Sequence, residues 1–505
     1  MDHRRQSQPT GASTSGPGFP GQGKKNDALL LSELERLIEL CQTATGQHRC
    51  WQRMRHHLLS QLVCLGRHTL TGVTATAGAA FQDWSAQYRL YSQARFDPEA
   101  VFAVVREQLE QQLSGQEPLV VAMDDSLLRK TGTHIPGVSW RRDPLGPPFQ
   151  VNFVKAQRVL QLSAALPSAE NGSARLVPID FQHVPTPRKP KPKASAQEWK
   201  CYGRACRQNS ITQRASQRLH ALRQHLDTRG SDQRRLSLVV DGRFTNRTLL
   251  KSIPHDTLVT GRIRSDAKLY FLPEAQPSGA GRKRIYGQLA PTPEQLRRDP
   301  SVPWRKVRAF ATGRYHEFRV KRLRPLRWRA TSDQCEVQLV VVAALGYRLR
   351  KNSKVLYRKP AYLIATDASL PIQQLLQQYL WRWDIEVNFR DEKTLFGVGQ
   401  AQVRHPTSAH YVPALAVAAY SLLLLAARNA FPSERTPLTL PLPKWRSHKP
   451  SRASTQNLIA LLRRELWADA ITSRNFSHFK SNTSANHKSR KSLPNLPGAL
   501  FYAPN

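Results

Sequence analysis

Four polar residues within one short stretch have the types and the spacing of a phosphate-handling site. In YLWRWDIEVNFRDEK, Tyr379 is followed by Arg382, Glu386 and Lys393 at offsets of 3, 7 and 14 residues. With about 100° of rotation per residue, a single helix places all four side chains on one face. A carboxylate, two cations and a phenol suit a metal ion beside a phosphodiester better than a core stripe. The spacing also fits a solvated face with i,i+3 and i,i+4 ion pairs, and spacing alone does not separate these interpretations.

Two aspartates far upstream favour the catalytic interpretation. The apolar run PLVVAMD ends at Asp124 and RLSLVVDG carries Asp241, so each is predicted at the carboxyl end of a buried strand. With Glu386 they form a set of hard oxygen ligands of the kind that Mg²⁺ or Mn²⁺ prefers. Two such ions can activate the attacking oxygen and stabilise the leaving oxygen in a displacement at phosphorus. One strand-end aspartate is often only a turn former, so the argument depends on the order strand–Asp, strand–Asp, helix–Glu.

The sequence resembles a DDE transposase of a bacterial insertion sequence, with an RNase H-like catalytic core. The resemblance rests on MDDS at 123–126, on VVDG at 239–242 and on the Tyr-x2-Arg-x3-Glu-x6-Lys signature, which is met at all four positions. The separation of 145 residues between Asp241 and Glu386 agrees with the β-rich insertion that some of these enzymes carry. The resemblance covers about residues 118–430.

The resemblance implies a role for each acidic residue. Asp124, Asp241 and Glu386 would be the catalytic residues and would bind two Mg²⁺ (or Mn²⁺) ions. Members of the family place a Ser or Thr two residues after the first catalytic aspartate, and Ser126 then selects Asp124 rather than Asp125. From the residues alone, the choice between the two aspartates depends on which of their side chains the strand directs towards the site.

The resemblance also implies DNA-binding roles. Arg382 and Lys393 would hold phosphates near the cleaved end. Tyr379 would contact the DNA backbone or stack near the flipped base found in hairpin-forming relatives. Trp304 or Trp328 could stack on such a base, although tryptophans in this kind of position more commonly pack in the protein or lie on its surface. The implied partners are double-stranded DNA, as terminal inverted repeats and target, and a second copy of the chain in the active complex.

The charge balance independently indicates a polyanionic partner. The chain has 76 Lys and Arg against 36 Asp and Glu, a formal net charge of +40. The basic residues are spread along the chain and form no single amphipathic anchor, which favours nucleic acid over a membrane. Hydrophobic residues make up 40% of the sequence, enough for a sizeable core.

The cysteines and the apolar runs of the sequence indicate in which cellular compartment the protein is expected. The six cysteines form no C-x-x-C pair, which is typical of a reduced intracellular protein. The first 27 residues are polar and lack the apolar segment of a secretory leader. The longest apolar run, 414–427, is short for a membrane span and suits a buried helix. We therefore expect a soluble, cytoplasmic, nucleoid-associated protein.

The predicted fold class is α/β: an RNase H-like mixed-sheet catalytic core interrupted by a β-rich insertion, with an α-helical amino-terminal region that binds DNA. The predicted domains are 1–27, a disordered basic tail; 28–115, helical and DNA-binding; 116–261, the first part of the core; 262–369, the β-rich insertion; 370–432, the second part of the core with the glutamate helix; and 433–505, a basic and largely flexible segment.

The function predicted from these patterns is cut-and-paste DNA transposition. Hydrolysis at each transposon end would free a 3′-hydroxyl, and transesterification would open the other strand, possibly through hairpin ends, and join target DNA. Two alternatives remain open. One is another RNase H-like metal nuclease, such as a junction resolvase. The other is a non-catalytic DNA-binding protein derived from a transposase.

Overall fold

The computed structural model describes residues 29–467 except 82, 116, 144–145, 148, 169–171, 231–232, 275–283, 349–351 and 433–451. The predicted tail at 1–27 lies outside the described residues, as does most of the predicted basic segment at 433–505. Within that segment the structure describes one helix, α13 (Thr455–Trp467), where the sequence TQNLIALLRRELW predicts an amphipathic helix.

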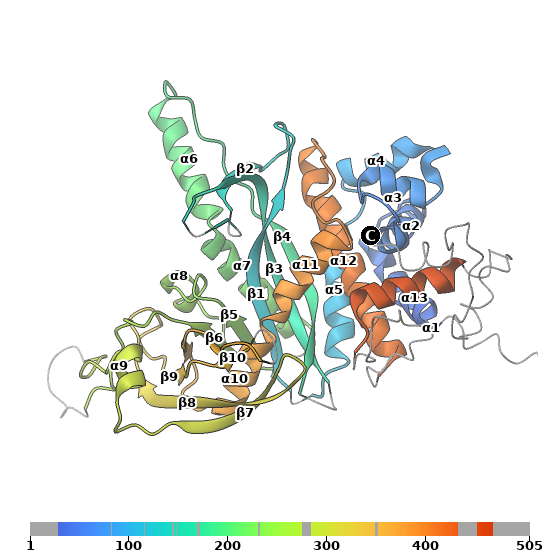
Figure 1. The fold of residues 1–505 in the computed structure, drawn as a ribbon. Coiled ribbons are helices and arrows are strands. Elements are labelled where there is room, and N and C mark those ends of the chain that lie inside the picture. Colours follow the sequence, from blue (N-terminus) through green and yellow to red (C-terminus); the bar gives the residue numbers. More distant parts are fainter. Residues whose placement is uncertain are drawn as a thin grey trace, which may run out of the picture.

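A mixed sheet forms the centre of the fold (Figure 1). Strand β1 (Leu119–Arg129) pairs in antiparallel fashion with β3 (Phe153–Pro167) and in parallel with β5 (Leu236–Val240). Two further strands, β2 (Ser139–Arg142) and β4 (Ala174–His183), pair with β3. The strand β3 thus lies between β1 and β4, and both of these pairings are antiparallel. This mixed α/β arrangement is RNase H-like, as the sequence predicts.

The strands of the predicted β-rich insertion continue this same sheet. Beyond β5 the order is β6, β12, β9, β8 and β7, with parallel pairing only between β5 and β6. These strands run over Thr257–Arg262 (β6), Arg305–Ala311 (β7), Arg314–Leu326 (β8), Val337–Val342 (β9) and Ala361–Ala365 (β12). A separate two-stranded sheet comprises Gly346–Tyr347 (β10) and Leu356–Tyr357 (β11). The boundaries between the proposed domains stay predictions.

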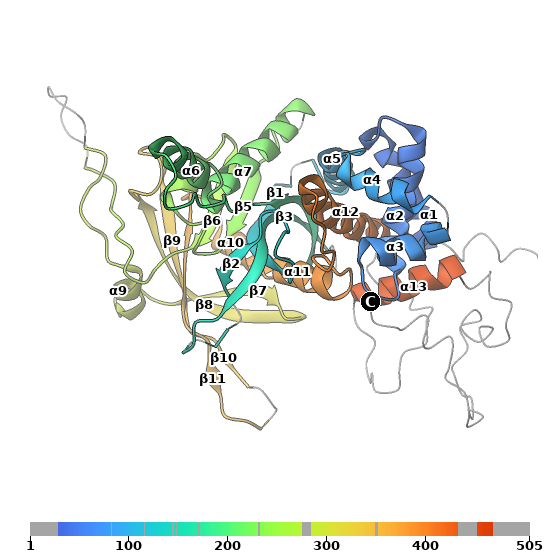
Figure 2. The same cartoon turned by 90° about the horizontal axis from the view of Figure 1, so that it is seen from above.

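The helix α12 (Pro406–Ala430) packs between the sheet and the amino-terminal helices (Figures 1 and 2). It contacts β4 of the sheet and also the helices Leu29–Leu40 (α1) and Pro98–Glu110 (α5). In the described part of the chain it is the one helix long and apolar enough to span a membrane, but 83% of its most apolar window is buried. The prediction of a buried core helix in this stretch is therefore confirmed.

The amino-terminal region is helical, as predicted, and side chains cap two of its helices. Thr69 Oγ1 accepts a hydrogen bond from the backbone of Gly72, and Asp83 Oδ1 accepts one from Ala86. Such caps satisfy amide groups that a helix start leaves without partners. The elements run over Leu29–Leu40 (α1), Cys41–Ala44 (η1), His48–Val63 (α2), Leu70–Thr76 (α3), Ala79–Phe81 (η2), Trp84–Ser92 (α4) and Pro98–Glu110 (α5).

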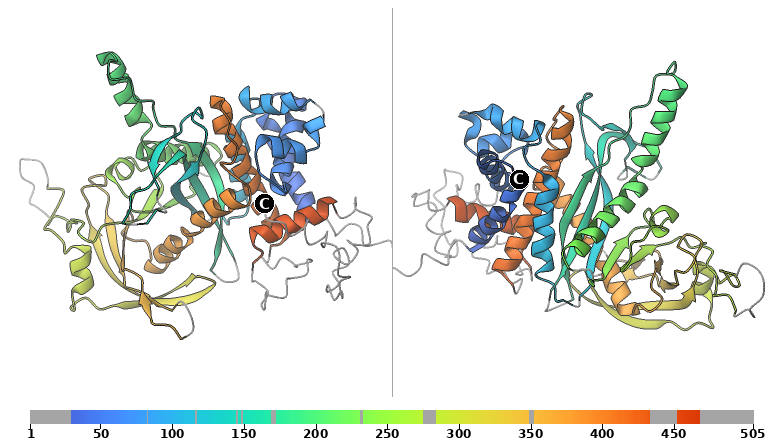
Figure 3. Two further views of the ribbon diagram at one scale, coloured as in Figure 1. Left: turned by 45° about the horizontal axis from the view of Figure 1, so that its top comes forward. Right: turned by 180° about the vertical axis from the view of Figure 1, so that it is seen from behind.

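Figure 3 shows the remaining helices from two further sides. They run over Ala196–Gln208 (α6), Ile211–Thr228 (α7), Arg247–Leu250 (α8), Pro293–Arg298 (α9), Ile372–Trp381 (α10) and Asp384–Thr394 (α11).

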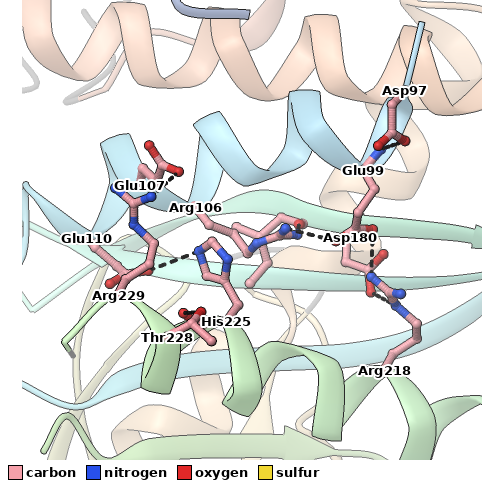
Figure 4. A network of polar contacts seen from close by, with 11 residues as sticks. Asp97, Glu99, Arg106, Glu107, Glu110, Asp180, Arg218, His225, Thr228 and Arg229 are labelled. Atoms are coloured by element: carbon pink, nitrogen blue, oxygen red, sulfur yellow. Dashed lines mark hydrogen bonds and ion pairs between the residues drawn. The ribbon is translucent and has the colours of Figure 1, made fainter. Parts of the chain in front are cut away.

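A network of ion pairs joins α5 and α7 to the central sheet (Figure 4). Glu99 on α5 accepts hydrogen bonds from Arg106 and Arg218, each at 2.8 Å. Arg218 on α7 also pairs with Asp180, a buried residue of β4. Removing one partner of a buried pair leaves an uncompensated charge and costs about 3–5 kcal/mol. The network therefore fixes the amino-terminal helices to the core that carries the acidic residues.

A buried histidine makes the amino-terminal region sensitive to acid. The ring of His57 donates from Nε2 to Gln87 Oε1 at 2.9 Å and accepts from the Tyr91 hydroxyl at Nδ1, 3.0 Å away. Burial lowers the pKa of His57 from 6.5 to about 4. Because the unfolded chain then binds more protons than the folded one between these values, folding stability is complete above pH 6.5 and is lost as the pH falls towards 4.

We expect His57→Gln to flatten this acid dependence. Replacing the ring should lower the slope of unfolding free energy against pH by at most about 1.4 kcal/mol per pH unit, the value for one proton. Denaturant unfolding at several pH values between 4 and 7 measures the slope. The matched control is His48→Gln, because His48 is exposed on the same helix. An equal slope in His57→Gln and in the unmodified protein would contradict the prediction.

Candidate active site

Strand pairing places the first two acidic residues side by side. In the parallel ladder of β1 and β5, Met123 is opposite Val240, so Asp124 and Asp241 follow at the same level. Asp241 comes directly after β5, as the sequence predicts. The prediction that β1 ends at Asp124 was wrong, because β1 continues to Arg129 along β3 and pairs Asp124 with Gln161. Pairing with the antiparallel neighbour β3 continues β1 beyond the point where its parallel neighbour β5 ends.

Alternation along β1 sends Asp124 and Asp125 to opposite faces of the sheet. Val120 and Ala122 pack against Ile385 of α11, so Asp124, two residues further on, faces α11 as well. Asp125 lies on the other face, where its carboxylate pairs with two arginines: Arg158 Nε lies 3.0 Å from Oδ2 and Arg243 Nη1 lies 2.6 Å from Oδ1. The geometry thus separates the two aspartates that the sequence left open.

The predicted single helix through Tyr379 and Lys393 was wrong. Helix α10 ends at Trp381 and α11 begins at Asp384. At the junction the backbone bonds become i→i+3, from Trp383 to Leu380 and from Glu386 to Trp383, which tightens the chain. The two helices bury their apolar residues in different clusters, Leu375 and Leu376 of α10 in one, Ile385 and Phe389 of α11 in the other.

Arg382, at this junction, links the first aspartate to the glutamate. Its Nη1 lies 3.4 Å from Asp124 Oδ2, and its Nη2 lies 3.4 Å from Glu386 Oε1. The guanidinium is buried, whereas the side chain of Glu386 is 41% exposed. Tyr379 is half-buried on α10, with its ring centre 5.8 Å from the guanidinium carbon of Arg382. The break between the helices thus gathers Asp124, Arg382, Glu386 and Tyr379 at one place.

Burial and a neighbouring carboxylate raise the pKa of Asp124 to about 7. Burial is the larger cause, and the charge of Asp241 is the next. The backbone amide of Asp125, which donates to Asp124 Oδ1 at 2.8 Å, and the guanidinium of Arg382 act in the opposite direction. A carboxyl group with so high a pKa sits in a place where added positive charge would be favourable.

Lys393 joins the same face through Ser126. Its Nζ donates a hydrogen bond of 2.6 Å to Ser126 Oγ, and burial lowers the pKa of the ammonium group. Ser126 follows Asp124 by two residues on β1 and therefore points to the same side of the sheet. The serine and the lysine extend the polar face beyond the carboxylates.

The side chains present fit a hard divalent cation. Among the described residues, no three His, Cys, Asp or Glu side chains already form a closed metal cage. The fit rests instead on chemistry: Asp124, Asp241 and Glu386 offer only oxygen ligands, and the pKa of Asp124 is raised by burial and, second, by the charge of Asp241, a repulsion that a cation would relieve. These three residues are the ones that would hold such an ion.

Sequence reasoning missed one acidic residue close to this site. Glu392 is fully buried on α11, and its Oε1 accepts a hydrogen bond of 2.8 Å from Gln161, the residue opposite Asp124. Burial raises the pKa of Glu392 to about 8. Its burial could have been predicted from its spacing to Ile385 and Phe389, because all three residues lie on the buried face of α11.

The two tryptophans considered for base stacking pack against apolar clusters, and Trp328 also contacts the main core. Trp304 and Trp328 both contact the cluster that contains Leu326 and Val337. Trp304 also has the ammonium of Lys321 4.8 Å from its ring centre. Neither is brought together with the acidic residues by any described contact.

The chain matches a known protein family over much of its length. A model of the family described as DDE superfamily endonuclease matches residues 39–334. The matched region contains Asp124 and Asp241 and ends before α10 and α11, so Glu386 lies outside it. No curated protein matches the chain.

Proposed function

The chain belongs to the DDE superfamily endonucleases, whose model matches more than half of it, and from this premise we propose that it is a DNA transposase. It would cut the ends of a mobile element of the bacterial insertion-sequence class and join them to target DNA. The observation that carries the proposal is the meeting of Asp124, Asp241 and the Arg382–Glu386 pair at one face of the sheet.

The three acidic residues have one joint role. Asp124, Asp241 and Glu386 would hold two Mg²⁺ or Mn²⁺ ions, which supply activation of the attacking oxygen and stabilisation of the leaving oxygen. With a pKa of about 7, Asp124 is partly protonated at neutral pH, which reduces its repulsion with Asp241 in the free protein. Loss of that proton completes the negative charge of the site.

The basic residues of the signature would orient the DNA. The guanidinium of Arg382 can offer two parallel N–H groups to a phosphate, and the Lys393 ammonium a compact charge beside Ser126. Both cations are buried or half-buried, so each electrostatic contact is stronger than it would be in water. Tyr379 stands next to Arg382 and would contact the backbone or a displaced base.

The proposed partners follow from the charge of the chain. A net charge of +40 supports binding to double-stranded DNA with a steep salt dependence. The amino-terminal helices would read the terminal repeats, and two copies of the chain would bridge the two ends. We place this activity in the cytoplasm at the nucleoid.

Cleavage of DNA that carries the inverted repeats flanking the gene tests the proposal. With Mg²⁺ we expect strand cuts at the repeat ends that leave 3′-hydroxyl groups, followed by joined products when target DNA is added. A four-way junction of unrelated sequence serves as the comparison substrate. Cutting of the junction without cutting of the repeats would replace the transposase by a resolvase-type nuclease. Tight binding to the repeats without any cleavage would replace it by a DNA-binding protein.

A further inference from the structure

A helical arm projects from the rest of the molecule (Figures 1 and 3). It consists of a segment rich in proline and lysine, 185–195, and of the helix α6 that follows it; we refer to residues 185–208 as the arm. No residue of α6 is buried. Because most helices in proteins are stabilised by packing one face against a core, burial does not account for the presence of α6 at this position.

Contacts within the arm hold it in its folded form. Ser195 and Glu198 form a capping box, in which the Ser195 amide donates to Glu198 Oε2 at 2.8 Å and the Glu198 amide donates to Ser195 Oγ at 3.3 Å. The rings of Trp199 and Tyr202 pack edge to face with their centres 5.9 Å apart. The ammonium of Lys189 lies 5.8 Å from the ring centre of Trp199, so the segment before α6 lies against the helix. The arm is thus formed before any partner binds.

The charge of the arm is almost entirely positive. It has a single acidic residue, Glu198, whose carboxylate belongs to the capping box. Seven basic residues are all exposed, and in the described part of the chain none of them pairs with a carboxylate. They are Arg188, Lys189, Lys191, Lys193, Lys200, Arg204 and Arg207. An excess of cations without counter-charges attracts a polyanion.

Three of these basic side chains form a stripe along one face of α6. Lys200, Arg204 and Arg207 follow one another at intervals of four and three residues. At about 100° per residue they lie within about 60° of one another, and at about 1.5 Å per residue the stripe is about 10 Å long. A straight row of cations on a preformed helix suits a stiff duplex, which carries one negative charge per about 1.7 Å of its axis.

The arm leaves the sheet beside the acidic residues. Across the sheet, Asp124 is opposite Gln161, and Gln161 is opposite Phe181 of β4. Strand β4 ends two residues later at His183, and the arm begins at residue 185. A helix of 13 residues is about 20 Å long, the length of about six base pairs. DNA that reaches Asp124 therefore has a basic helix of that length next to its path.

We propose that the arm binds the phosphate backbone of the duplex that extends away from the acidic residues. That this duplex is the DNA to be cut rests on the proposed function, whereas binding by the arm requires no cleavage. A duplex is favoured over an unpaired strand because the indole of Trp199 already contacts Tyr202 and Lys189 and is not a bare stacking surface. Contacts to phosphates carry no sequence information, so the arm holds any duplex equally well.

Binding of a fluorescent duplex in EDTA tests this proposal without any chemistry. The neutral variant combines Lys200→Gln, Arg204→Gln and Arg207→Gln. At about 0.1 M salt it should bind about 10-fold or more weakly, and the salt slope of its affinity should fall by about 3, close to 1 for each lost phosphate contact. The loss should be the same for DNA with the inverted repeat and for DNA of unrelated sequence.

The matched control keeps the charge at the same three positions, with Lys200→Arg, Arg204→Lys and Arg207→Lys. It should bind the duplex within about 2-fold of the unmodified protein and with the full salt slope. Because Gln, Lys and Arg have similar helix propensities, both variants should keep α6 folded. Equal thermal unfolding midpoints of the two variants check this directly.

Unchanged duplex affinity and salt slope in the neutral variant would overturn the proposal. The same variants are also measured with an unpaired strand and with polyglutamate. A larger loss for the unpaired strand than for the duplex would replace the duplex by single-stranded DNA, and a loss for polyglutamate alone would replace it by an acidic protein segment.

The two proposals fail separately. If the neutral variant loses duplex affinity as predicted but no DNA is ever cleaved, the transposase proposal fails alone. If the repeats are cleaved and the neutral variant binds the duplex as the unmodified protein does, the proposal for the arm fails alone.

Discussion

Glu386→Gln is expected to abolish Mg²⁺-dependent cleavage and to leave DNA binding intact. The amide keeps the volume of the side chain and can still accept a hydrogen bond from Arg382, but it removes one of the three negative charges at the site. Losing several kcal/mol of charge stabilisation in the transition state corresponds to a fall in cleavage rate of about 10³-fold or more. Single-turnover cleavage of end DNA measures the rate, and a gel-shift titration without metal measures the affinity.

The matched control for this variant is Asp384→Asn. Asp384 is a carboxylate on the same helix, but its partner is Arg452, at 3.7 Å, and it makes no described contact with Asp124 or Arg382. Its substitution should leave the cleavage rate within a few-fold of that of the unmodified protein. Cleavage by Glu386→Gln at the full rate, or an equal loss in both variants, would remove Glu386 from the mechanism.

Asp124→Asn and Asp125→Asn are expected to have opposite consequences. Asp124→Asn should lower the cleavage rate about 10³-fold or more, for the reason given for Glu386. It should also stabilise the metal-free protein above pH 7, because a carboxyl group with a raised pKa costs folding free energy once it is ionised. Activity and stability therefore move in opposite directions in this variant.

Asp125→Asn should keep the cleavage rate and lose stability. Its carboxylate side chain is 7% exposed and neutralises Arg158 and Arg243 on the opposite face of β1. Leaving partly buried arginines without their partner costs about 3 kcal/mol of folding free energy. Denaturant unfolding at pH 8 and the cleavage assay together give the result. Loss of cleavage in Asp125→Asn with full cleavage in Asp124→Asn would contradict this prediction, because the first metal ligand would then be Asp125.

Local patterns were sufficient to predict the elements that bring the aspartates together. An apolar, β-branched run is stable as a buried strand, and two such parallel neighbours bring the residues at their carboxyl ends to one edge, as for Asp124 and Asp241. Cap residues such as Thr69 act on amides within their own turn, so the sequence shows them directly. The long apolar run at 414–427 needs burial in any soluble fold, and α12 supplies it.

Features that depend on tertiary packing were not visible in the sequence. No proline or glycine marks the break at Arg382, which exists because α10 and α11 pack on different clusters. The continuation of β1 past Asp124 is determined by β3, which lies further along the chain. The pocket lined by Arg129, Arg141, Arg158 and Arg243 draws on residues that are far apart in the chain, so no local pattern indicates it.

Direct measurement of Mn²⁺ binding tests the central claim, that Asp124, Asp241 and Glu386 share a divalent cation. Calorimetric titration of the protein bound to end DNA that has already been cut avoids turnover during the measurement. We predict binding by the unmodified protein and by Asp384→Asn, and a loss of affinity of about 10²-fold or more in Asp124→Asn, Asp241→Asn and Glu386→Gln. Mn²⁺ affinity that is unchanged in these three variants would contradict the account.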